Sequence, residues 1–510
     1  MSVLSLAAAA VDYVCRSLHW PLMLDSPVMH YVVFLMQHGL KPYSQITDMN
    51  MPGAYLTEWF GMLAFGSSDL AWRVYEFALL ALLTAAMCVV AGRRNRIAGL
   101  YAGGVFLVMH AAEGPRQAVE RDEVIAVLMM LSYAALFASV RRQKPYLMFL
   151  IGVGSGLAAS IKPTFLPFAS ILFAMAWIEL RRRGVFTLQY LLAFLSGIAA
   201  VSALVLGFLL HYHAVGDLFF ILHTVIPVYR GSSRTLFIAV RAIPKYLFPI
   251  VPFATAALIG NLRQGLRWNW ERWTLAGGVL LGLISYFVQG KGIVYHRYEY
   301  LVCLLLLMGL EIFASLRGAA AWRWSGAAAV FITIACVVPI YLWNLHHVQG
   351  NSDFTLALEN DLQELGGAAA LQDKVQCLDL TTGCLNALYH LEIVENGGYS
   401  GDMLFFTAPS NPATEYYRKV YLQRAAEDPP TVLVLSNQDT TGSQGFNRIG
   451  NWPAFQTSLD QHFTEVTSRS FPREGLIGSA PSIPAQEAPS YRIYIRNQSP
   501  LIKTAIHLLK

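Results

Sequence analysis

The chain has 510 residues, of which 55% are hydrophobic and only 14% charged, and its mean hydropathy is +0.44. Soluble domains carry roughly 25% charged residues, so the composition excludes an ordinary soluble enzyme. Residues 1–343 carry 26 Lys and Arg against 15 Asp and Glu, a net of +11. Residues 344–510 carry 11 Lys and Arg against 17 Asp and Glu, a net charge of −6. We therefore predict a basic transmembrane domain over 1–343 and an acidic domain over 344–510.

Apolar segments recur through the first domain. Eleven can be distinguished, at about 3–19, 69–91, 97–112, 123–140, 146–161, 165–180, 185–210, 246–262, 273–290, 301–316 and 326–343. Several are shorter than the roughly 20 residues that a membrane span needs. The first also contains Asp12 and Arg16, which can pair on one helix face. The pattern predicts a polytopic α-helical membrane protein with about 11 transmembrane helices.

Clusters of basic residues mark every second connection between these segments. They are Arg93/Arg94/Arg96, Arg141/Arg142/Lys144, Arg181–Arg183, Arg263/Arg267/Arg272 and Arg317/Arg323. By the positive-inside rule these loops are cytoplasmic, which places the acidic domain outside the inner (cytoplasmic) membrane, in the periplasm or its equivalent. Because most of the positive charge lies in such short loops, it does not require a nucleic-acid partner.

The outward loops are also basic, but acids are interleaved with their Lys and Arg residues. Basic residues on the outer side run against the topological bias. An anionic ligand held at the outer membrane face would explain them. Alternatively, they pair with the neighbouring acids or extend toward lipid head groups.

The first outward loop contains signals for a short helix. Ser26 suits an N-cap, Pro27 the first helical position and Gly39 the C-terminal stop. About twelve apolar-rich residues between them cannot cross a bilayer, so we predict that the helix lies along the membrane surface. Asp25 would then stand just before this helix, at the outer end of the first segment.

Several motifs in these loops resemble the GT-C superfamily of membrane glycosyltransferases, and more narrowly its bacterial branch related to protein mannosyltransferases and lipid A aminoarabinose transferases. Besides Asp25 and the helix after it, the motifs are Gly39-Leu-Lys-Pro-Tyr43, Asp48-Met-Asn50-Met-Pro52-Gly53, Phe65-Gly-Ser-Ser-Asp-Leu-Ala-Trp-Arg73, Glu120-Arg121-Asp122, Lys162-Pro-Thr164 and Gln289-Gly-Lys-Gly-Ile-Val-Tyr-His-Arg-Tyr298. The resemblance covers about residues 1–345. It implies a hexosyl- or pentosyltransferase of the cell envelope that moves a sugar from a polyprenyl-phosphate donor, usually with inversion, to a glycan, lipid or protein acceptor.

The resemblance also implies roles for acidic residues. Asp25 matches the first-loop catalytic acid, the general base toward the acceptor hydroxyl, and Asp122 or its neighbour Glu120 matches the second-loop acid. Asp48 is a further catalytic candidate. One departure concerns the Lys-Pro-Pro of aminoarabinose-transferase relatives, which is Met51-Pro52-Gly53 here. The phosphate contact expected of that Lys must come from elsewhere or be absent.

The chemistry of inverting transfer is compatible with these residues. A carboxylate takes the proton of the attacking hydroxyl, and fixed cations can stabilise a lipid-phosphate leaving group. The outward candidates for substrate binding are Asn50, Arg116, Glu120, Arg121, Lys162, Lys291, Tyr295, His296 and Arg297. Two acids and His296 could also collect a divalent cation such as Mg²⁺ or Mn²⁺, although no tight ligand spacing demands one.

Structural roles are the alternative for these residues. Asp25 could simply cap the surface helix, and Asp48 could form an Asx turn before Pro52. Arg121 and Asp122 could balance the neighbouring acids.

In the acidic domain, residues 375–380, 431–436 and 491–496 are typical of strands, and 354–365 and 414–426 of helices. A Gly/Ser/Pro-rich loop is predicted near 474–490. Cys377 and Cys384 could form a disulfide if the domain is exported. We expect this small α/β domain to bind the acceptor or to pack on the membrane part.

Two other functions compete with glycosyl transfer. A transporter or flippase of a lipid-linked anionic substrate would also need outward cations, but the internal repeats and midplane polar residues common in transporters are not evident. A scaffold that recruits partners through its outer domain leaves the acids of the first loop unexplained.

Overall fold

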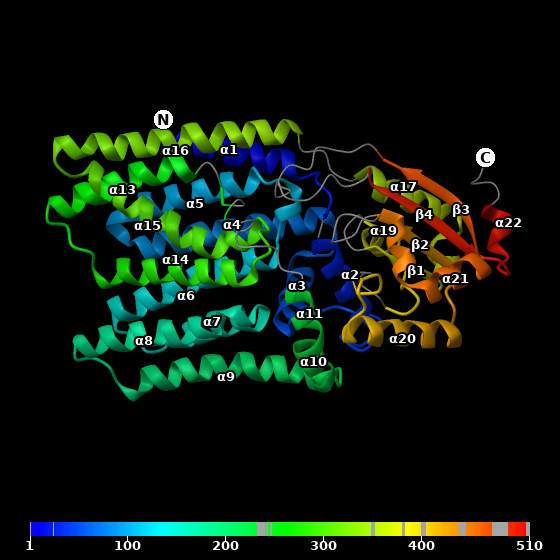
Figure 1. Ribbon diagram of the computed structural model, residues 1–510. Coiled ribbons are helices and arrows are strands. Elements are labelled where there is room, and N and C mark those ends of the chain that lie inside the picture. Colours follow the sequence, from blue (N-terminus) through cyan, green and yellow to red (C-terminus); the bar gives the residue numbers. More distant parts are fainter. Residues whose placement is uncertain are drawn as a thin grey trace.

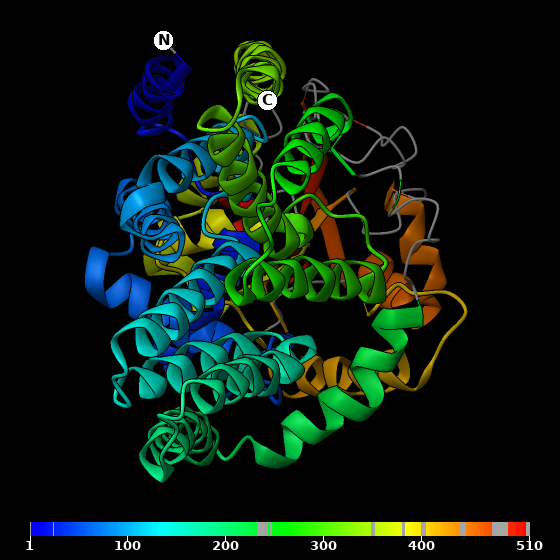
Figure 2. The same ribbon diagram turned by 90° about the vertical axis from the view of Figure 1, so that its left-hand side faces the viewer.

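A computed structural model describes residues 2–505 except 24, 232–239, 241–242, 245–246, 348–351, 380–382, 399–403, 438–444 and 472–487. Within the described residues, the chain up to His347 is helical, and a C-terminal region from Ser352 onward is built around a small sheet (Figure 1). Seen from the end opposite the sheet, several long helices are viewed nearly end-on and the sheet lies behind the bundle (Figure 2).

A helix occupies each of the eleven predicted apolar segments. These helices are α1 (Ser2–Ser17), α4 (Asp69–Ala91), α5 (Arg96–Ala111), α6 (Arg121–Arg142), α7 (Leu147–Ile161), α8 (Leu166–Arg182), α9 (Leu188–His211), α13 (Leu247–Arg263), α14 (Trp270–Gln289), α15 (Tyr298–Leu316) and α16 (Ala320–His347). Six helical stretches of the described chain are long and apolar enough to cross a membrane. They are Asp69–Ala91, Arg121–Arg142, Pro163–Arg182, Leu188–His211, Tyr295–Leu316 and Trp322–Asn344. The chain is therefore a multi-pass membrane protein by length and composition.

The Arg-rich connections gather at one end of the helical bundle. Arg141 donates a hydrogen bond to Glu271 at 2.8 Å, and Arg317 donates one to Asn95 at 2.5 Å. The connections from α8 to α9 and from α13 to α14 lie at the left-hand end of Figure 1, opposite the sheet. The Arg-rich connections, which the sequence places at every second loop, thus correspond to one of two distinct ends of the bundle.

Helix α2 (Asp25–Gln37) differs from its prediction. It begins at Asp25, so Ser26 lies inside the first turn, and the Ser26 hydroxyl donates to the carbonyl of Ala118 at 2.8 Å instead of capping the helix. Most of α2 is buried, because α3 (Pro52–Phe65) and α19 (Cys384–His390) pack against it. It lies between the bundle and the C-terminal region, not exposed along a membrane surface (Figure 1).

Shorter helical turns connect the long helices. They are η1 (Arg93–Asn95), η2 (Pro115–Gln117), η3 (Pro163–Phe165), α10 (Val215–Phe220), η4 (Ile221–Val225), α11 (Ile226–Gly231) and η5 (Tyr295–Arg297). Of these, η4 is a π-helical turn. The turns η2, η3 and η5 carry or adjoin candidate site residues.

The C-terminal sheet has the strand order β1-β2-β4-β3. Strands β1 (Val375–Leu378) and β2 (Val432–Ser436) are parallel, and β4 (Ser490–Arg496) pairs antiparallel with β2 and with β3 (Phe463–Ser470). Three of these strands were predicted. Strand β3 was not, because it is a largely polar, exposed edge strand without a regular alternation.

Six further helices surround the sheet: α17 (Ser352–Glu364), α18 (Gly367–Leu371), α20 (Pro412–Glu427), η6 (Gly445–Asn451), α21 (Pro453–His462) and α22 (Leu501–Ala505). The predicted helices correspond to α17 and α20. Most of the predicted loop at 474–490 lies outside the described residues.

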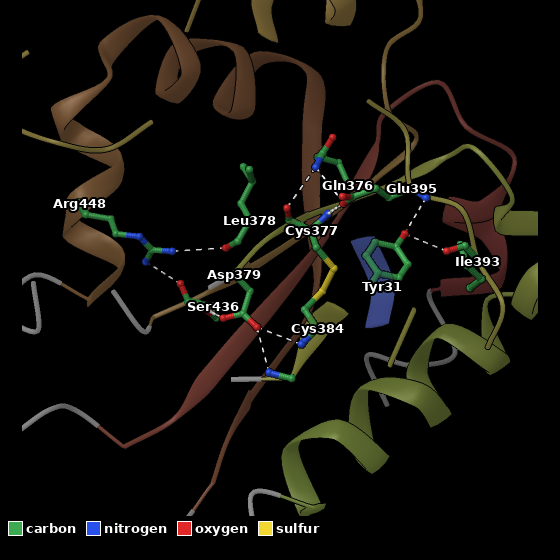
Figure 3. Close-up of a disulfide and its surroundings, with 11 residues drawn as sticks. Tyr31, Gln376, Cys377, Leu378, Asp379, Cys384, Ile393, Glu395, Ser436 and Arg448 are labelled. Carbon is green, nitrogen blue, oxygen red and sulfur yellow. Dashed lines mark hydrogen bonds between the residues drawn. A yellow bond between two sulfur atoms is a disulfide. The ribbon is translucent and has the colours of Figure 1, made fainter. Parts of the chain in front are cut away.

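A disulfide joins Cys377 on β1 to Cys384 at the start of α19 (Figure 3), as the sequence allowed. Tyr31 of α2 reaches the same neighbourhood. Its hydroxyl donates to the carbonyl of Ile393 at 2.9 Å and accepts from the N–H of Glu395 at 2.8 Å. A residue of the first outward loop is therefore bonded directly to the C-terminal region.

Candidate active site

The carboxylate of Asp25 is held by two donors from distant parts of the chain. Its Oδ2 accepts a hydrogen bond from Arg121 of α6 at 2.5 Å and another from the hydroxyl of Tyr295 of η5 at 2.8 Å. Its Oδ1 has no hydrogen-bond partner among the described residues, and 32% of the side chain is exposed. One oxygen is thus anchored, and the other is available to accept a proton.

Asp122 belongs to a buried cluster beside this site. Lys162, between α7 and α8, contacts Asp122 and lies 3.3 Å from Oε1 of Glu299 on α15. Asp122 and Glu299 also interact electrostatically with each other. The cluster brings Asp122 and Lys162 together, as the sequence suggested, and adds Glu299.

Glu120 is a buried acid of the second outward loop. The residue is 2% exposed, and Oε1 has no hydrogen-bond partner among the described residues. Burial raises the pKa of the Glu120 carboxyl well above its usual value; the charge of Asp25 raises it further, while Arg121 opposes this. A buried polar atom without a partner is uncommon in a finished core, so Glu120 is suited to meet a bound ligand.

Of the remaining cations, Arg297 forms a buried ion pair with Glu113. Lys291 donates to the carbonyl of Tyr229 at 2.9 Å and lies 3.7 Å from the centre of its ring. Both cations have further contacts. The side chain of Arg116 lies outside the described residues.

His296 is buried, and its Nδ1 has no hydrogen-bond partner in the described chain. Electrostatic interactions connect it to Asp122, Lys162 and Arg121. The structure thus brings His296 close to the acid Asp122.

Asp48 and Asn50 form a separate, local network. The Asp48 carboxylate accepts hydrogen bonds from the N–H of Met49 at 2.8 Å, the amide of Asn50 at 2.7 Å and the hydroxyl of Tyr55 at 2.9 Å. These partners all lie within seven residues, and the network stabilises the turn that leads into α3. The network gives Asp48 a local structural role. Its backbone bond reaches the next residue, not the residue two positions on as in the predicted Asx turn, and the network does not join Asp48 to Asp25.

Sequence reasoning missed two acids near the site. Glu299 lies in the first turn of α15, two residues before the apolar segment predicted at 301–316. That position is itself a signal, because acids are rare at the edge of a membrane segment unless they have a partner. Glu58 of α3 lies 2.7 Å from Nδ1 of His30 on α2 and interacts electrostatically with Arg121. Burial raises the pKa of Glu58, while His30 lowers it. No local pattern distinguishes Glu58, since its partner lies on another helix.

A divalent cation does not fit this arrangement. Among the described residues, no group of three or more His, Cys, Asp or Glu is placed to hold a metal ion. The carboxylates of Asp25 and Asp122 are paired with Arg121 and Lys162. Fixed side-chain cations thus stand beside the two acids.

The fold resembles two kinds of solved structure. ArnT from Cupriavidus metallidurans in the apo state aligns over 98% of this chain and 98% of its own, with a TM-score of 0.58 and 13% identity. The same protein bound to undecaprenyl phosphate aligns with a TM-score of 0.52 over the same shares and at the same identity. The Archaeoglobus fulgidus oligosaccharyltransferase in the apo form aligns over 99% of this chain and 77% of its own, with a TM-score of 0.51 and 13% identity.

No family model and no curated protein matches the sequence. At such low identity the structural likeness establishes the fold alone. It nevertheless agrees with the resemblance read from the loop motifs, since ArnT and the oligosaccharyltransferase are both GT-C enzymes. The chain has the same fold as these ArnT and oligosaccharyltransferase structures.

Proposed function

We propose that this protein is an inverting glycosyltransferase that moves a sugar from a polyprenyl-phosphate donor to an acceptor hydroxyl at the outer face of the cytoplasmic membrane. The observation that carries the proposal is the geometry of Asp25. Its Oδ2 is anchored by Arg121 and Tyr295, and its Oδ1 has no partner among the described residues. A general base needs this combination of fixed orientation and an available oxygen.

In the proposed reaction, Asp25 Oδ1 takes the proton of the acceptor hydroxyl while the acceptor oxygen attacks the anomeric carbon of the sugar. The bond from that carbon to the phosphate oxygen breaks, and polyprenyl phosphate leaves. Because a phosphate monoester is a stable anion, cations can stabilise the leaving group without a general acid. The reaction needs no oxidant or further reactant.

The donor phosphate is assigned to the basic residues around Asp25 and Asp122. Four basic residues approach this region. Arg297 comes from η5, and Arg121, Lys162 and Lys291 come from the outer ends of α6, α7 and α14, respectively. One solved ArnT structure holds undecaprenyl phosphate, and one oligosaccharyltransferase structure holds dolichol phosphate with an inhibitory peptide. These ligands support a lipid-phosphate site here. We assign the sugar contacts to Glu120 and His296, whose buried polar atoms lack partners in the described chain.

The chain is proposed to consist of a transmembrane catalytic domain, residues 1–343, and an extracytoplasmic α/β domain, residues 344–510. The Arg-rich connections at the opposite end of the bundle support this orientation. The disulfide between Cys377 and Cys384 supports it as well, because disulfides persist in oxidising compartments. The C-terminal region contacts the first outward loop through Tyr31 and Asn386, which is consistent with packing on the catalytic part.

The deciding experiment incubates the purified protein with polyprenyl-phosphate-linked sugars and follows release of polyprenyl phosphate. Mass spectrometry of the lipid-linked sugars that accumulate in a deletion strain identifies the donor to test. We expect release to depend on an acceptor. Movement of the lipid-linked sugar across vesicles without release of polyprenyl phosphate would instead indicate a flippase.

A further inference from the structure

The peptide group between Ala118 and Val119 is held at both ends by buried side chains. Its carbonyl oxygen, on Ala118, accepts from the Ser26 hydroxyl at 2.8 Å, and its N–H, on Val119, donates to Oε2 of Glu123 at 2.8 Å. Ser26 is 4% exposed and Glu123 0%. We call this group the 118–119 peptide.

The two side chains that hold the 118–119 peptide come from the two elements that carry the candidate catalytic acids. Ser26 directly follows Asp25 in α2, and Glu123 directly follows Asp122 in α6. The Ser26 bond joins α2 to the loop before α6, whereas the Glu123 bond is local to the start of α6. The 118–119 peptide is therefore a direct connection between the first and the second outward loop.

Val119 adopts a backbone conformation that valine rarely takes. Its φ is +54°, in the left-handed region, which is strongly unfavourable for a β-branched residue. Such residues persist only where the surrounding structure constrains them, and they cluster at functional sites. Here the bonds from Ser26 and Glu123 supply the constraint. The residue that follows is Glu120, so the left-handed turn sets the direction in which the Glu120-Arg121-Asp122 segment leaves the loop.

We propose that Ser26 and Glu123 are positioning residues for the transfer reaction. By fixing the 118–119 peptide, they hold Arg121 against Asp25. They also fix the position of the loop that carries Asp25 relative to the loop that carries Asp122. The expected effect on the rate rests on the proposed function. Whether the 118–119 peptide is held by its hydrogen bonds can be measured without any substrate. A misplacement of reacting groups by about 1 Å can cost about 100-fold in rate, so the connection is expected to affect kcat more than donor KM.

The test compares Glu123→Leu, which removes the acceptor, with Glu123→Gln, which keeps a carbonyl oxygen for the Val119 N–H. We expect kcat to fall about 10- to 100-fold in the Leu variant and to stay near wild type in the Gln variant. Ser26→Ala should lower kcat as well. Because both side chains hold one peptide, the double variant should lose less than the product of the two single effects.

The matched control is Ser155→Ala. The Ser155 hydroxyl is also buried, but it donates to Ile151 of its own helix at 2.5 Å, so its loss should leave kcat unchanged.

The rate of hydrogen exchange at the Val119 amide reports directly on whether the bond to Glu123 is formed. Exchange should be slow in the wild type and fast in Glu123→Leu, whichever donor or acceptor the enzyme uses. Unchanged exchange in Glu123→Leu, or wild-type kcat in both Ser26→Ala and Glu123→Leu, would overturn the proposal. Absence of turnover in the wild-type protein itself would count against the proposed function instead.

Discussion

Arg121 donates a hydrogen bond to Asp25 at 2.5 Å, although 96 residues separate them in the chain. The contact joins the first outward loop to the second and places a guanidinium group beside the candidate base. A phosphate group could accept bonds from the same guanidinium. The pair thus brings a proton acceptor and a potential phosphate ligand into one site.

Asp25→Asn should fold normally and lose about 10²–10⁴ in rate, because Asn can accept the same hydrogen bonds but cannot take the acceptor proton. Turnover of a lipid-linked donor by purified protein, with thermal unfolding measured alongside, checks this. Asp48→Asn is the control, since Asp48 stabilises a turn that does not contact Asp25. Turnover near wild type in Asp25→Asn would transfer the role of base to Asp122.

Loss of Lys291 should weaken use of the donor. If Lys291 contacts the lipid phosphate, Lys291→Ala removes a charge-assisted bond worth about 1.5–3 kcal/mol, which would appear as a higher donor KM. Arg297→Ala should weaken donor use in the same way, although it also leaves the buried Glu113 unpaired, so Lys291→Ala is the cleaner variant. Unchanged donor affinity in both variants would show that the phosphate binds elsewhere.

Lys162→Met should destabilise the protein by about 3–5 kcal/mol, because it leaves the buried acids Asp122 and Glu299 without their cation. Lys162→Arg keeps the charge and should recover much of the loss. Thermal unfolding in detergent measures both variants. A melting temperature near wild type in Lys162→Met would mean that the cluster contributes little to stability.

His390 should make the stability depend on pH. Its Nδ1 lies 2.7 Å from Glu359, and its Nε2 lies 3.4 Å from Asp69 at the start of α4. Burial lowers the pKa of His390, but the hydrogen bonds to Asp69 and Glu359 outweigh it and raise the pKa to about 9. Because the folded value exceeds the unfolded value of about 6.5, the stabilisation is complete below about pH 6.5 and is lost as the pH rises through about 9.

The measurement for His390 compares thermal unfolding of the wild type and His390→Gln across pH. We expect a difference of about 1–2 kcal/mol at pH 6, after allowing for solvent screening, and almost none at pH 10. A difference that stays constant or grows with pH would show that these contacts do not depend on the imidazolium.

The C-terminal region should be extracytoplasmic and oxidised. A reporter that is active only in the cytoplasm, fused after residue 350, should be silent, and strong activity would contradict the proposed topology. Under denaturing conditions without reductant, four of the six cysteines should react with a thiol reagent, since Cys377 and Cys384 are bonded. Labelling of all six would show that the disulfide is absent in the cell.

The sequence alone determined the features that depend on local composition. Each of the eleven apolar runs predicted a helix that the described residues contain, because a membrane segment must satisfy its backbone hydrogen bonds within itself. Strands β1 and β2 were predictable as short buried runs, and β4 was predictable from its alternation. The resemblance of the loop motifs to membrane glycosyltransferases indicated Asp25 and Asp122, and the basic residues of the outward loops indicated Arg121.

Only the tertiary structure decided which of these groups meet. The apolar face of α2 could equally be covered by lipid or by protein, and α19 covers it through contacts more than 300 residues away in the chain. Asp48 and Asp25 look alike in sequence, yet one binds its own turn and the other binds Arg121 and Tyr295. Partners of this kind lie on different helices, and no local pattern encodes the distance between them.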